Sequence, residues 1–269
     1  MRLSILASGS SGNATVVEAN GHCVLVDCGI SYRQLGQRMH AVGLAPGQIE
    51  AVLVSHEHSD HVQGLDVFLS RHPVPVLATR GTAGALRGVT VAEPLASGHA
   101  VKLGSLGVLP VATSHDAREP VGFVLEHGGR RVGLVTDTGV ITELVVERLA
   151  GCHALLLEAN HDVDMLRIGP YPWPLKQRIL SRTGHLANAQ MRVALERVIH
   201  SDLEVIVAMH LSRENNSPVL VRRELEAVVA GSTVRLEVAE QDQPLQLTIA
   251  GVARRQTQPS LFGDGEGRG

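Results

Sequence analysis

The chain is poor in aromatic side chains, in cysteine and in net charge. Aromatic residues make up only 2% of its 269 residues, so Val, Leu, Ile and Ala have to fill the core. The 3 cysteines are odd in number and form no framework, which argues against a secreted disulfide scaffold. A formal net charge of -3 gives no general basic field, so a polyanion could be bound only at a local patch.

Long apolar runs are absent as well. No segment approaches the roughly 18 apolar residues of a membrane span, and the apolar run 1–7 is too short for a signal peptide. We therefore expect a cytoplasmic protein without membrane contact. The hydrophobic content of 44% suffices for one domain over residues 1–250. From 251 to 269 the composition shifts to Gly, Arg and Gln, which predicts a flexible C-terminal tail.

The chain does contain a dense run of metal-ligand side chains, Val54-Ser-His-Glu-His-Ser-Asp-His61. It follows an apolar run that predicts a strand. His56 and His58 are two residues apart in extended chain and point the same way. Asp60 and His61 lie just beyond, where a turn can aim them at a neighbouring point. Imidazole and carboxylate bind zinc, manganese and iron, so the spacing indicates two metal ions side by side.

Alternating apolar patterns and turn signals predict an α/β fold. We expect helices at 34–42, 62–70, 81–86, 143–149, 188–200 and 220–229, and a long polar stretch without elements between 158 and 187. We expect strands at 2–7, 14–19, 23–26, 51–54, 73–78, 101–103, 106–112, 121–126, 131–135, 154–157, 205–209, 234–239 and 245–249.

Polar residues recur where these apolar runs end. The ends of separate runs carry, or are followed within three residues by, His56, His115, Asp137, Glu158 and His210. Because strand ends can meet at one edge of a sheet, distant residues can form one site there. Asp27 ends the second arm of a hairpin, where it can orient a neighbouring ligand. The loop 8–13 has two open interpretations, an anion cradle that includes Ser10, Ser11 and Asn13 or a tight turn permitted by glycine.

The pattern His-x-His-x-Asp-His at 56–61, followed by His115, Asp137 and His210, resembles the metallo-β-lactamase-fold hydrolases over residues 1 to about 250. The resemblance implies a four-layer αββα sandwich of two mixed sheets with helices on the outer faces. It also implies that His56, His58 and His115 hold one metal and that Asp60, His61 and His210 hold the other. Asp137 would bridge them, with a bridging hydroxide as nucleophile and Asp27 in support.

Further segments resemble the YycJ (WalJ)-like branch of that family. They are Ser8 to Ala14, Glu158 to Asp162, Tyr171 to Pro174, Gly184 to Asn188 and His210 to Asn216. The branch implies a manganese-dependent 5′→3′ DNA exonuclease linked to mismatch repair, with zinc or iron as alternative metals. Substrate-binding candidates in these and adjoining segments are Ser10, Ser11, Asn13, His161, Arg167, Tyr171, Trp173, Arg178, Ser212 and Asn215.

Basic and aromatic residues gather between 165 and 200, which favours a phosphodiester substrate. Trp173, the only tryptophan, and Tyr171 lie among six basic residues, Arg167, Lys176, Arg178, Arg182, Arg192 and Arg197. Basic groups beside stacking aromatics suit a DNA single strand or strand end. The alternative is a solvated helix face with proline-rich packing. His185 lies in the same stretch and could protonate the leaving oxygen, with Glu158 orienting it.

Other functions remain open. An RNA- or tRNA-end nuclease would use a similar Glu–His pair, but the His-Ser-Thr of the tRNA 3′-processing nucleases is here His-Leu-Ala at 185–187. A glyoxalase-type thioester hydrolase would share the metal motif yet needs no leaving-group acid. Outside the enzymes, the chain could be a clamp-tethered accessory factor with a structural metal site.

The predicted tail contains a short apolar motif in polar surroundings, Gln258-Pro-Ser-Leu-Phe262. It resembles the bacterial sliding-clamp-binding motif, in which Gln258, Leu261 and Phe262 would make the contacts. The alternative is that the tail folds back onto its own domain.

Overall fold

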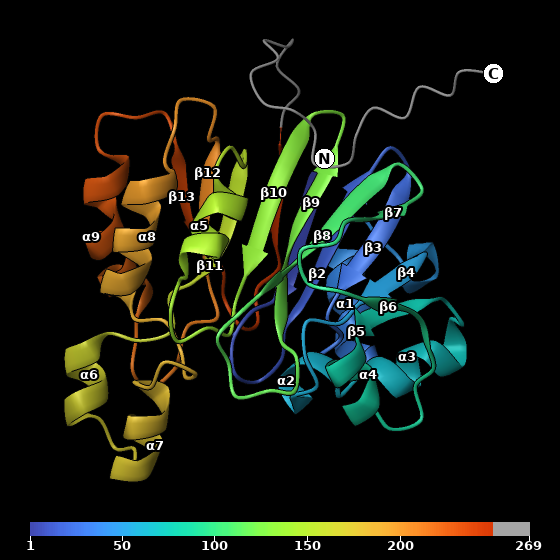
Figure 1. Ribbon diagram of the computed structural model, residues 1–269, viewed down its shortest axis with the longest axis horizontal. Coiled ribbons are helices and arrows are strands. Elements are labelled where there is room, and N and C mark those ends of the chain that lie inside the picture. The colour runs from blue at the N-terminus through green and yellow to red at the C-terminus, as the bar shows by residue number, and fades with distance from the viewer. Residues whose placement is uncertain (250–269) are drawn as a thin grey trace.

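Two seven-stranded sheets form the centre of the molecule (Figure 1). The computed structural model describes residues 1–249, so the predicted tail and its clamp motif at 258–262 lie outside the described residues. The first sheet has the order β14-β1-β2-β3-β4-β5-β6. Its strands are β1 Arg2–Ala7, β2 Ala14–Ala19, β3 His22–Val26, β4 Ala51–Leu53, β5 Val76–Thr79, β6 Val91–Leu95 and β14 Leu245–Thr248.

The second sheet has the order β13-β12-β11-β10-β9-β8-β7. In the first sheet the neighbours from β14 to β3 are antiparallel, and those from β3 to β6 are parallel. In the second sheet the neighbours from β7 to β10 are antiparallel, and those from β10 to β13 are parallel. Its strands are β7 Val101–Leu103, β8 Leu106–Ala112, β9 Val121–His127, β10 Arg130–Val135, β11 Ala154–Glu158, β12 Val205–Met209 and β13 Arg235–Val238.

Helices cover the outer face of each sheet. α1, α3 and α4 flank the first sheet, while α5, α8 and α9 flank the second (Figure 1). The bounds are α1 Tyr32–Ala41, α2 Ser59–Val62, α3 Leu65–Arg71, α4 Arg80–Ala85, α5 Glu143–Leu149, α6 Val163–Ile168, α7 Trp173–Ile179, α8 Asn188–Val198 and α9 Pro218–Val229, with a 3₁₀ turn at Pro46–Gln48. Within residues 1–249 no helix is long and apolar enough to cross a membrane.

The side-chain period of two explains the four layers. In β11, Ala154 and Leu156 face the core between the sheets, while Leu155 and Leu157 face α5 and α8. The parallel strands β4, β5, β11 and β12 are buried on both faces and therefore read as nearly continuous apolar runs, whereas the edge strands β6 and β13 are partly exposed. The predicted αββα sandwich of two mixed sheets with outer helices is confirmed.

Three parts of the sequence-based prediction were wrong. The predicted helix 62–70 is two short helices, α2 and α3, which meet at Gly64. A Cβ at Gly64 would lie 2.0 Å from the Ile30 carbonyl oxygen, so only glycine permits this close approach. The strand β6 was missed, and the stretch 158–187, expected to lack elements, contains α6 and α7.

Candidate metal centre

The predicted ligands meet at one edge of the sandwich, where parallel strands of both sheets end. Asp27 follows β3, Asp137 comes two residues after β10, and His210 follows β12. All three have positive φ, at 59°, 55° and 57° respectively. Left-handed backbone at a non-glycine residue costs about 1–3 kcal/mol and persists only where the surroundings enforce it. Of the four non-glycine residues with positive φ in residues 1–249, these three carry a carboxylate or imidazole that turns back toward the site, and the fourth, Asn20, lies in the turn between β2 and β3.

His56, His58 and His115 form the first cluster, with one ring nitrogen from each lying within 4.8 Å of the others. His115 Nε2 lies 3.3 Å from His58 Nδ1. The other nitrogen of His115, Nδ1, donates to the Gly184 carbonyl oxygen at 3.1 Å. That bond fixes the ring and leaves Nε2 as the nitrogen that faces the cluster.

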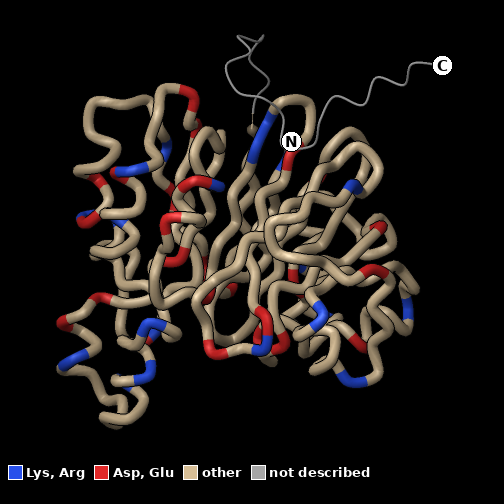
Figure 2. Tube along the Cα trace, in the orientation of Figure 1, with Lys and Arg blue, Asp and Glu red and all other residues tan. Residues whose placement is uncertain are grey.

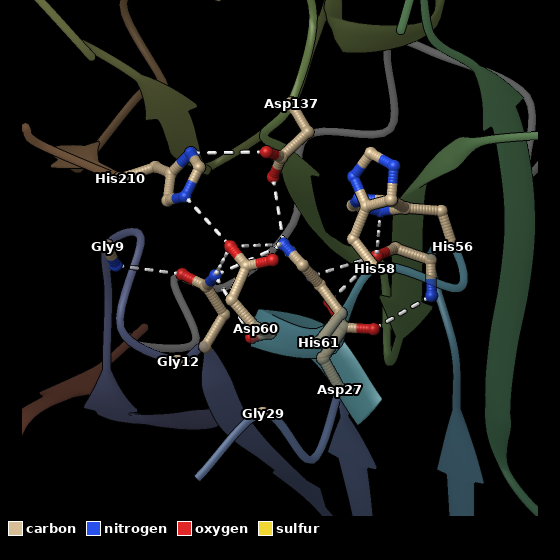
Figure 3. Close-up of polar contacts among 12 residues, drawn as sticks. Gly9, Gly12, Asp27, Gly29, His56, His58, Asp60, His61, Asp137 and His210 are labelled. Atoms are coloured by element: carbon tan, nitrogen blue, oxygen red, sulfur yellow. Dashed lines mark hydrogen bonds and ion pairs between the residues drawn. The ribbon is translucent and has the colours of Figure 1, made fainter. Parts of the chain in front are cut away.

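Asp60, His61, Asp137 and His210 form the second cluster (Figure 3). His61 Nε2 lies 3.2 Å from Asp137 Oδ2 and 3.6 Å from Asp60 Oδ2. His210 Nε2 also lies 3.6 Å from Asp60 Oδ2. His61 is 0% exposed and His210 is 1% exposed, so these ring nitrogens are shielded from solvent.

Asp137 lies between the clusters. Its Oδ1 is 3.9 Å from His115 Nε2 of the first cluster, while its Oδ2 reaches His61 of the second. Burial alone would raise the pKa of Asp137, but the facing rings of His210 and His61 hold this pKa well below its usual range. The group is therefore an anion placed to face both clusters.

The donor atoms suit divalent metal ions. His56 Nε2, Asp137 Oδ2 and His210 Nε2 are buried and have no hydrogen-bond partner among residues 1–249. Unpartnered buried acceptors are costly and rare in native proteins, unless a cation satisfies them. Several imidazoles with two carboxylates are a common ligand set for zinc, manganese and iron. The His and Asp clusters thus fit a divalent metal site.

Asp27 fixes the orientation of the His61 ring. Its Oδ2 accepts from His61 Nδ1 at 2.8 Å and from the Ser55 hydroxyl at 2.8 Å, and its Oδ1 accepts from the Ser55 amide. The bond to Nδ1 leaves His61 Nε2 facing Asp60 and Asp137. Sequence reasoning missed Ser55, although its position directly before His56 was a usable signal.

The loop 8–13 contacts the residues that carry the ligands. The amides of Gly9, Ser11, Gly12 and Asn13 donate to the Asn13 side chain, Gln241, Gly9 and Asp60 respectively. The Ser8 hydroxyl accepts from the His210 amide at 2.7 Å. Four amides of the loop are therefore engaged within the fold, which fits the tight-turn interpretation, and an anion-binding role for Ser10, Ser11 and Asn13 stays a prediction.

Glu158 and His185 form a pair beside the second cluster. Glu158 is 0% exposed, and its Oε1 accepts from His185 Nδ1 at 2.7 Å. The same oxygen lies 3.2 Å from His210 Nδ1, and Oε2 accepts from the Thr138 amide. Burial alone would lower the pKa of His185, but the carboxylate of Glu158 raises it on balance. Glu158 therefore contacts His185, which it was predicted to orient, and also His210.

A cavity of about 240 Å³ opens onto both clusters. One wall is the metal centre with His185, and the other comes from the segment that contains α7. The candidate substrate residues Ser10, Tyr171, Arg178 and Ser212 line it.

Other substrate candidates lie elsewhere. His161 and Asn215 are 1% and 0% exposed, so they present no polar group to a substrate. The side chain of Asn13 accepts from the Gly9 amide through Oδ1, and its Nδ2 contacts Asp60 and, at 3.1 Å, His61 Nε2. Ser11, Arg167 and Trp173 are exposed but do not line the cavity.

The basic residues predicted to form one substrate-binding track differ in their surroundings. Lys176 is buried and caps the end of α6, while Arg192 and Arg197 pair with acidic residues on α8, α9 and α5. Arg178 Nε lies 2.6 Å from Asp116 Oδ2, and Asp116 Oδ1 lies 3.4 Å from His115 Nε2. Sequence reasoning missed Asp116, although it directly follows His115.

The fold and the site define a class. Residues 22–211 match the family model of the β-lactamase superfamily domain, and the chain belongs to this superfamily, in its YycJ/WalJ branch. It is 34% identical over 235 residues to exodeoxyribonuclease YycJ of Bacillus anthracis, which covers 85% of this chain and 89% of that protein. Identity to exodeoxyribonuclease WalJ of Streptococcus pneumoniae strain D39 is also 34%, over 80% of this chain and 83% of WalJ.

A solved structure shares the fold. The metallo-β-lactamase fold protein YhfI from Bacillus subtilis superposes with a TM-score of 0.72 over 91% of this chain and 98% of YhfI. Sequence identity to YhfI is only 14%, so this likeness concerns the fold alone. The predicted family is confirmed by the family model and the two exodeoxyribonuclease relatives.

Proposed function

We propose that this chain is a phosphodiesterase with two divalent metal ions that degrades DNA from its ends in the 5′→3′ direction. The observation that carries the proposal is the convergence of two donor clusters on Asp137, where the buried His56 Nε2 and His210 Nε2 lack hydrogen-bond partners within the described residues 1–249. Kinship with two exodeoxyribonucleases, at 34% identity over most of each chain, supports DNA as the substrate.

Each cluster would hold one metal ion. His56, His58 and His115 would hold one ion, and Asp60, His61 and His210 the other, with Asp137 shared between them. Bound divalent ions supply Lewis acidity and lower the pKa of water, which suits attack on a phosphodiester. The choice of manganese rests on the family resemblance, because this ligand set also suits zinc or iron.

His185 would protonate the leaving sugar oxygen. Its Nδ1 is engaged by Glu158 at 2.7 Å, so Nε2 is the nitrogen available to a substrate in the cavity that His185 lines. The raised pKa favours a protonated ring near neutral pH, as a general acid requires. A thioester hydrolase would not need this acid, since a thiolate leaves without protonation.

The size of the cavity supports action at a chain end. At about 240 Å³ it is smaller than the roughly 300–1,000 Å³ of pockets that enclose a drug-sized ligand. It can admit a terminal phosphodiester with little of the attached chain. The link to mismatch repair, the cytoplasmic location and the sliding-clamp contact at 258–262 stay predictions from sequence.

Digestion of end-labelled nucleic acid tests the proposal. Single-stranded DNA, duplex DNA and RNA of one sequence would carry the label at the 5′ or the 3′ end. Each would be incubated with the metal-free chain and added Mn²⁺, Zn²⁺ or Mg²⁺. We expect 5′-labelled DNA to release labelled mononucleotide at once, while 3′-labelled DNA shortens gradually. Faster loss of RNA would contradict the DNA assignment, and no digestion with any metal would contradict the activity itself.

A further inference from the structure

The segment 163–180, here called the α6–α7 hairpin, exposes an unusual amount of apolar surface. Seven large hydrophobic side chains are exposed in residues 1–249, and three of them, Ile168, Trp173 and Leu180, lie on this segment. Ile168 is 86% exposed and Trp173 is 62% exposed. Single exposed apolar residues are ordinary, but such a concentration on one short element marks a contact surface.

The hairpin is continuous with the metal cavity. Tyr171, Leu175, Arg178 and Ile179 line the same cavity as His58, Asp60, Asp137 and His185. In Figure 1 the α6–α7 hairpin projects beyond the sheet edge at which the strands β10, β11 and β12 end. A polymer whose end enters the cavity therefore has to pass this surface.

Several contacts hold the hairpin at a fixed distance from the metal centre. The ammonium group of Lys176 donates to the carbonyl oxygens of Arg167 and Gly169, both at 2.7 Å, and so closes the end of α6 onto α7. The Asn215 carbonyl oxygen accepts from the Asp162 amide at the start of α6. At the end of α7, Ile179 accepts from the His185 amide, so the hairpin connects directly to the proposed general acid.

The charge near the hairpin suits a polyanion. Figure 2 shows Lys and Arg in this part of the molecule, and the side chains of Arg167, Arg178 and Arg182 are exposed. Arg178 pairs with Asp116 at the cavity mouth, and Arg167 has a loose contact of 3.6 Å with Asp164. An apolar surface bordered by guanidinium groups fits a strand that offers flat bases on one side and phosphates on the other.

We propose that the α6–α7 hairpin is a docking surface for a nucleic acid single strand, on which Trp173 stacks a base near the strand end held at the metal centre. The proposal rests on the proposed function and adds the single strand as the bound form. Base stacking on an aromatic side chain is tolerant of sequence, because every base has a π-face. The hairpin would therefore set affinity and the preference for unpaired ends without reading sequence.

Trp173 is the only tryptophan of the chain, so its fluorescence reports this surface directly. Titration of the metal-free chain with oligothymidylate avoids digestion during the measurement. We expect saturable quenching of the fluorescence, and duplex DNA with blunt ends should quench it at several-fold higher concentration. No quenching at oligonucleotide concentrations that bind the chain by anisotropy would overturn the proposal.

Substitution of Trp173 separates this inference from the proposed function. With single-stranded DNA, Trp173→Ala should raise KM about 5- to 150-fold, the range expected from loss of one stacking side chain, and should leave kcat within a few-fold. Trp173→Phe should recover most of the loss. Hydrolysis of bis(p-nitrophenyl) phosphate, which is too small to extend from the cavity to Trp173, should be unchanged in both variants.

Val219→Ala, at a 74% exposed position of α9, is the matched control and should leave the kinetic constants for both substrates unchanged. If the parent chain digests DNA and Trp173→Ala has an unchanged KM, the hairpin inference is wrong while the proposed function stands. If the parent hydrolyses neither DNA nor the small phosphodiester, the proposed function is wrong. Concentration-dependent dimerisation that Trp173→Ala abolishes would instead make the hairpin a contact between two copies, and would overturn the inference.

Discussion

The metal centre and the α6–α7 hairpin adjoin one cavity but are built in opposite ways. His56, His61, Asp137 and His210 are each at most 2% exposed, and His61 and His210 are held through one ring nitrogen by Asp27 and Glu158 respectively. The hairpin turns Trp173 and Ile168 toward solvent. Chemistry here depends on buried groups with fixed orientation, whereas binding of a long substrate depends on exposed surface. Changes in the centre should therefore affect turnover and metal, and changes in the hairpin should affect KM.

The largest effect is expected from loss of a ligand. His58→Ala removes one of three ring nitrogens in the first cluster, so DNA digestion should fall by about 10³-fold or more. Initial rates on single-stranded DNA, with metal content from mass spectrometry, measure this. His99→Ala, at an exposed position far along the chain, is the control and should keep full activity. Undiminished digestion by the His58 variant would show that the first cluster is not part of the active site.

The next largest effect should separate acid catalysis from metal binding. His185→Gln removes the group that Glu158 orients, so kcat should fall about 10²- to 10⁴-fold with metal content unchanged. A substrate with a p-nitrophenolate leaving group needs little protonation, so its hydrolysis should fall far less. Loss of metal in this variant would make His185 a ligand, and equal losses on both substrates would contradict its role as an acid.

A smaller effect is expected from the support behind the ligands. Asp27→Asn keeps the left-handed backbone accessible but replaces one carboxylate oxygen that His61 Nδ1 and the Ser55 hydroxyl share. Metal affinity should fall about 10- to 100-fold, as is typical when a ligand loses its orienting partner. Competition with a chelator measures the change. Unaltered affinity would show that His61 is oriented by other contacts.

The smallest effect concerns acid stability outside both regions. Burial, with the charges of Arg130 and His200, lowers the pKa of half-buried His153 to about 4. Between pH 6.5 and 4 the unfolded chain thus binds more protons at this site, and the free energy of unfolding falls as pH falls. Solvent screening limits the change to about 1 kcal/mol.

His153→Gln keeps an acceptor for the Arg131 amide and should flatten this dependence. Denaturant unfolding of both chains at pH 7 and pH 4.5 provides the comparison. The difference in unfolding free energy between the chains should shift in favour of the variant at the lower pH. A difference that does not change with pH would contradict the assigned shift.

Sequence patterns predicted the parts that depend on local spacing. Apolar alternation located most strands, and residues at the ends of these runs, such as His115 and His210, indicated one common edge. The dense motif at 56–61 contributed four of the clustered donors, which the structure brings together with Asp137. Periodicity sufficed here because ligands follow strands directly.

The features that sequence patterns did not predict depend mainly on contacts between distant segments. The proline-rich stretch 170–174 hid the start of α7, since prolines at the first turn of a helix resemble a loop in sequence. Lys176 was counted among the basic residues of the stretch 165–200 but is buried against the carbonyl groups at the end of α6. The second contact of Glu158, with His210, joins residues 52 positions apart and has no local signal.

The central claim is that two metal ions at the sheet edge are required for cleavage of DNA. Titration of the metal-free chain with Mn²⁺, followed together by bound metal and by release of nucleotides from 5′-labelled DNA, tests it most directly. We expect activity and binding both to saturate at two ions per chain, and His58→Ala to bind only one. Full activity with one ion per chain, or activity independent of added metal, would contradict it.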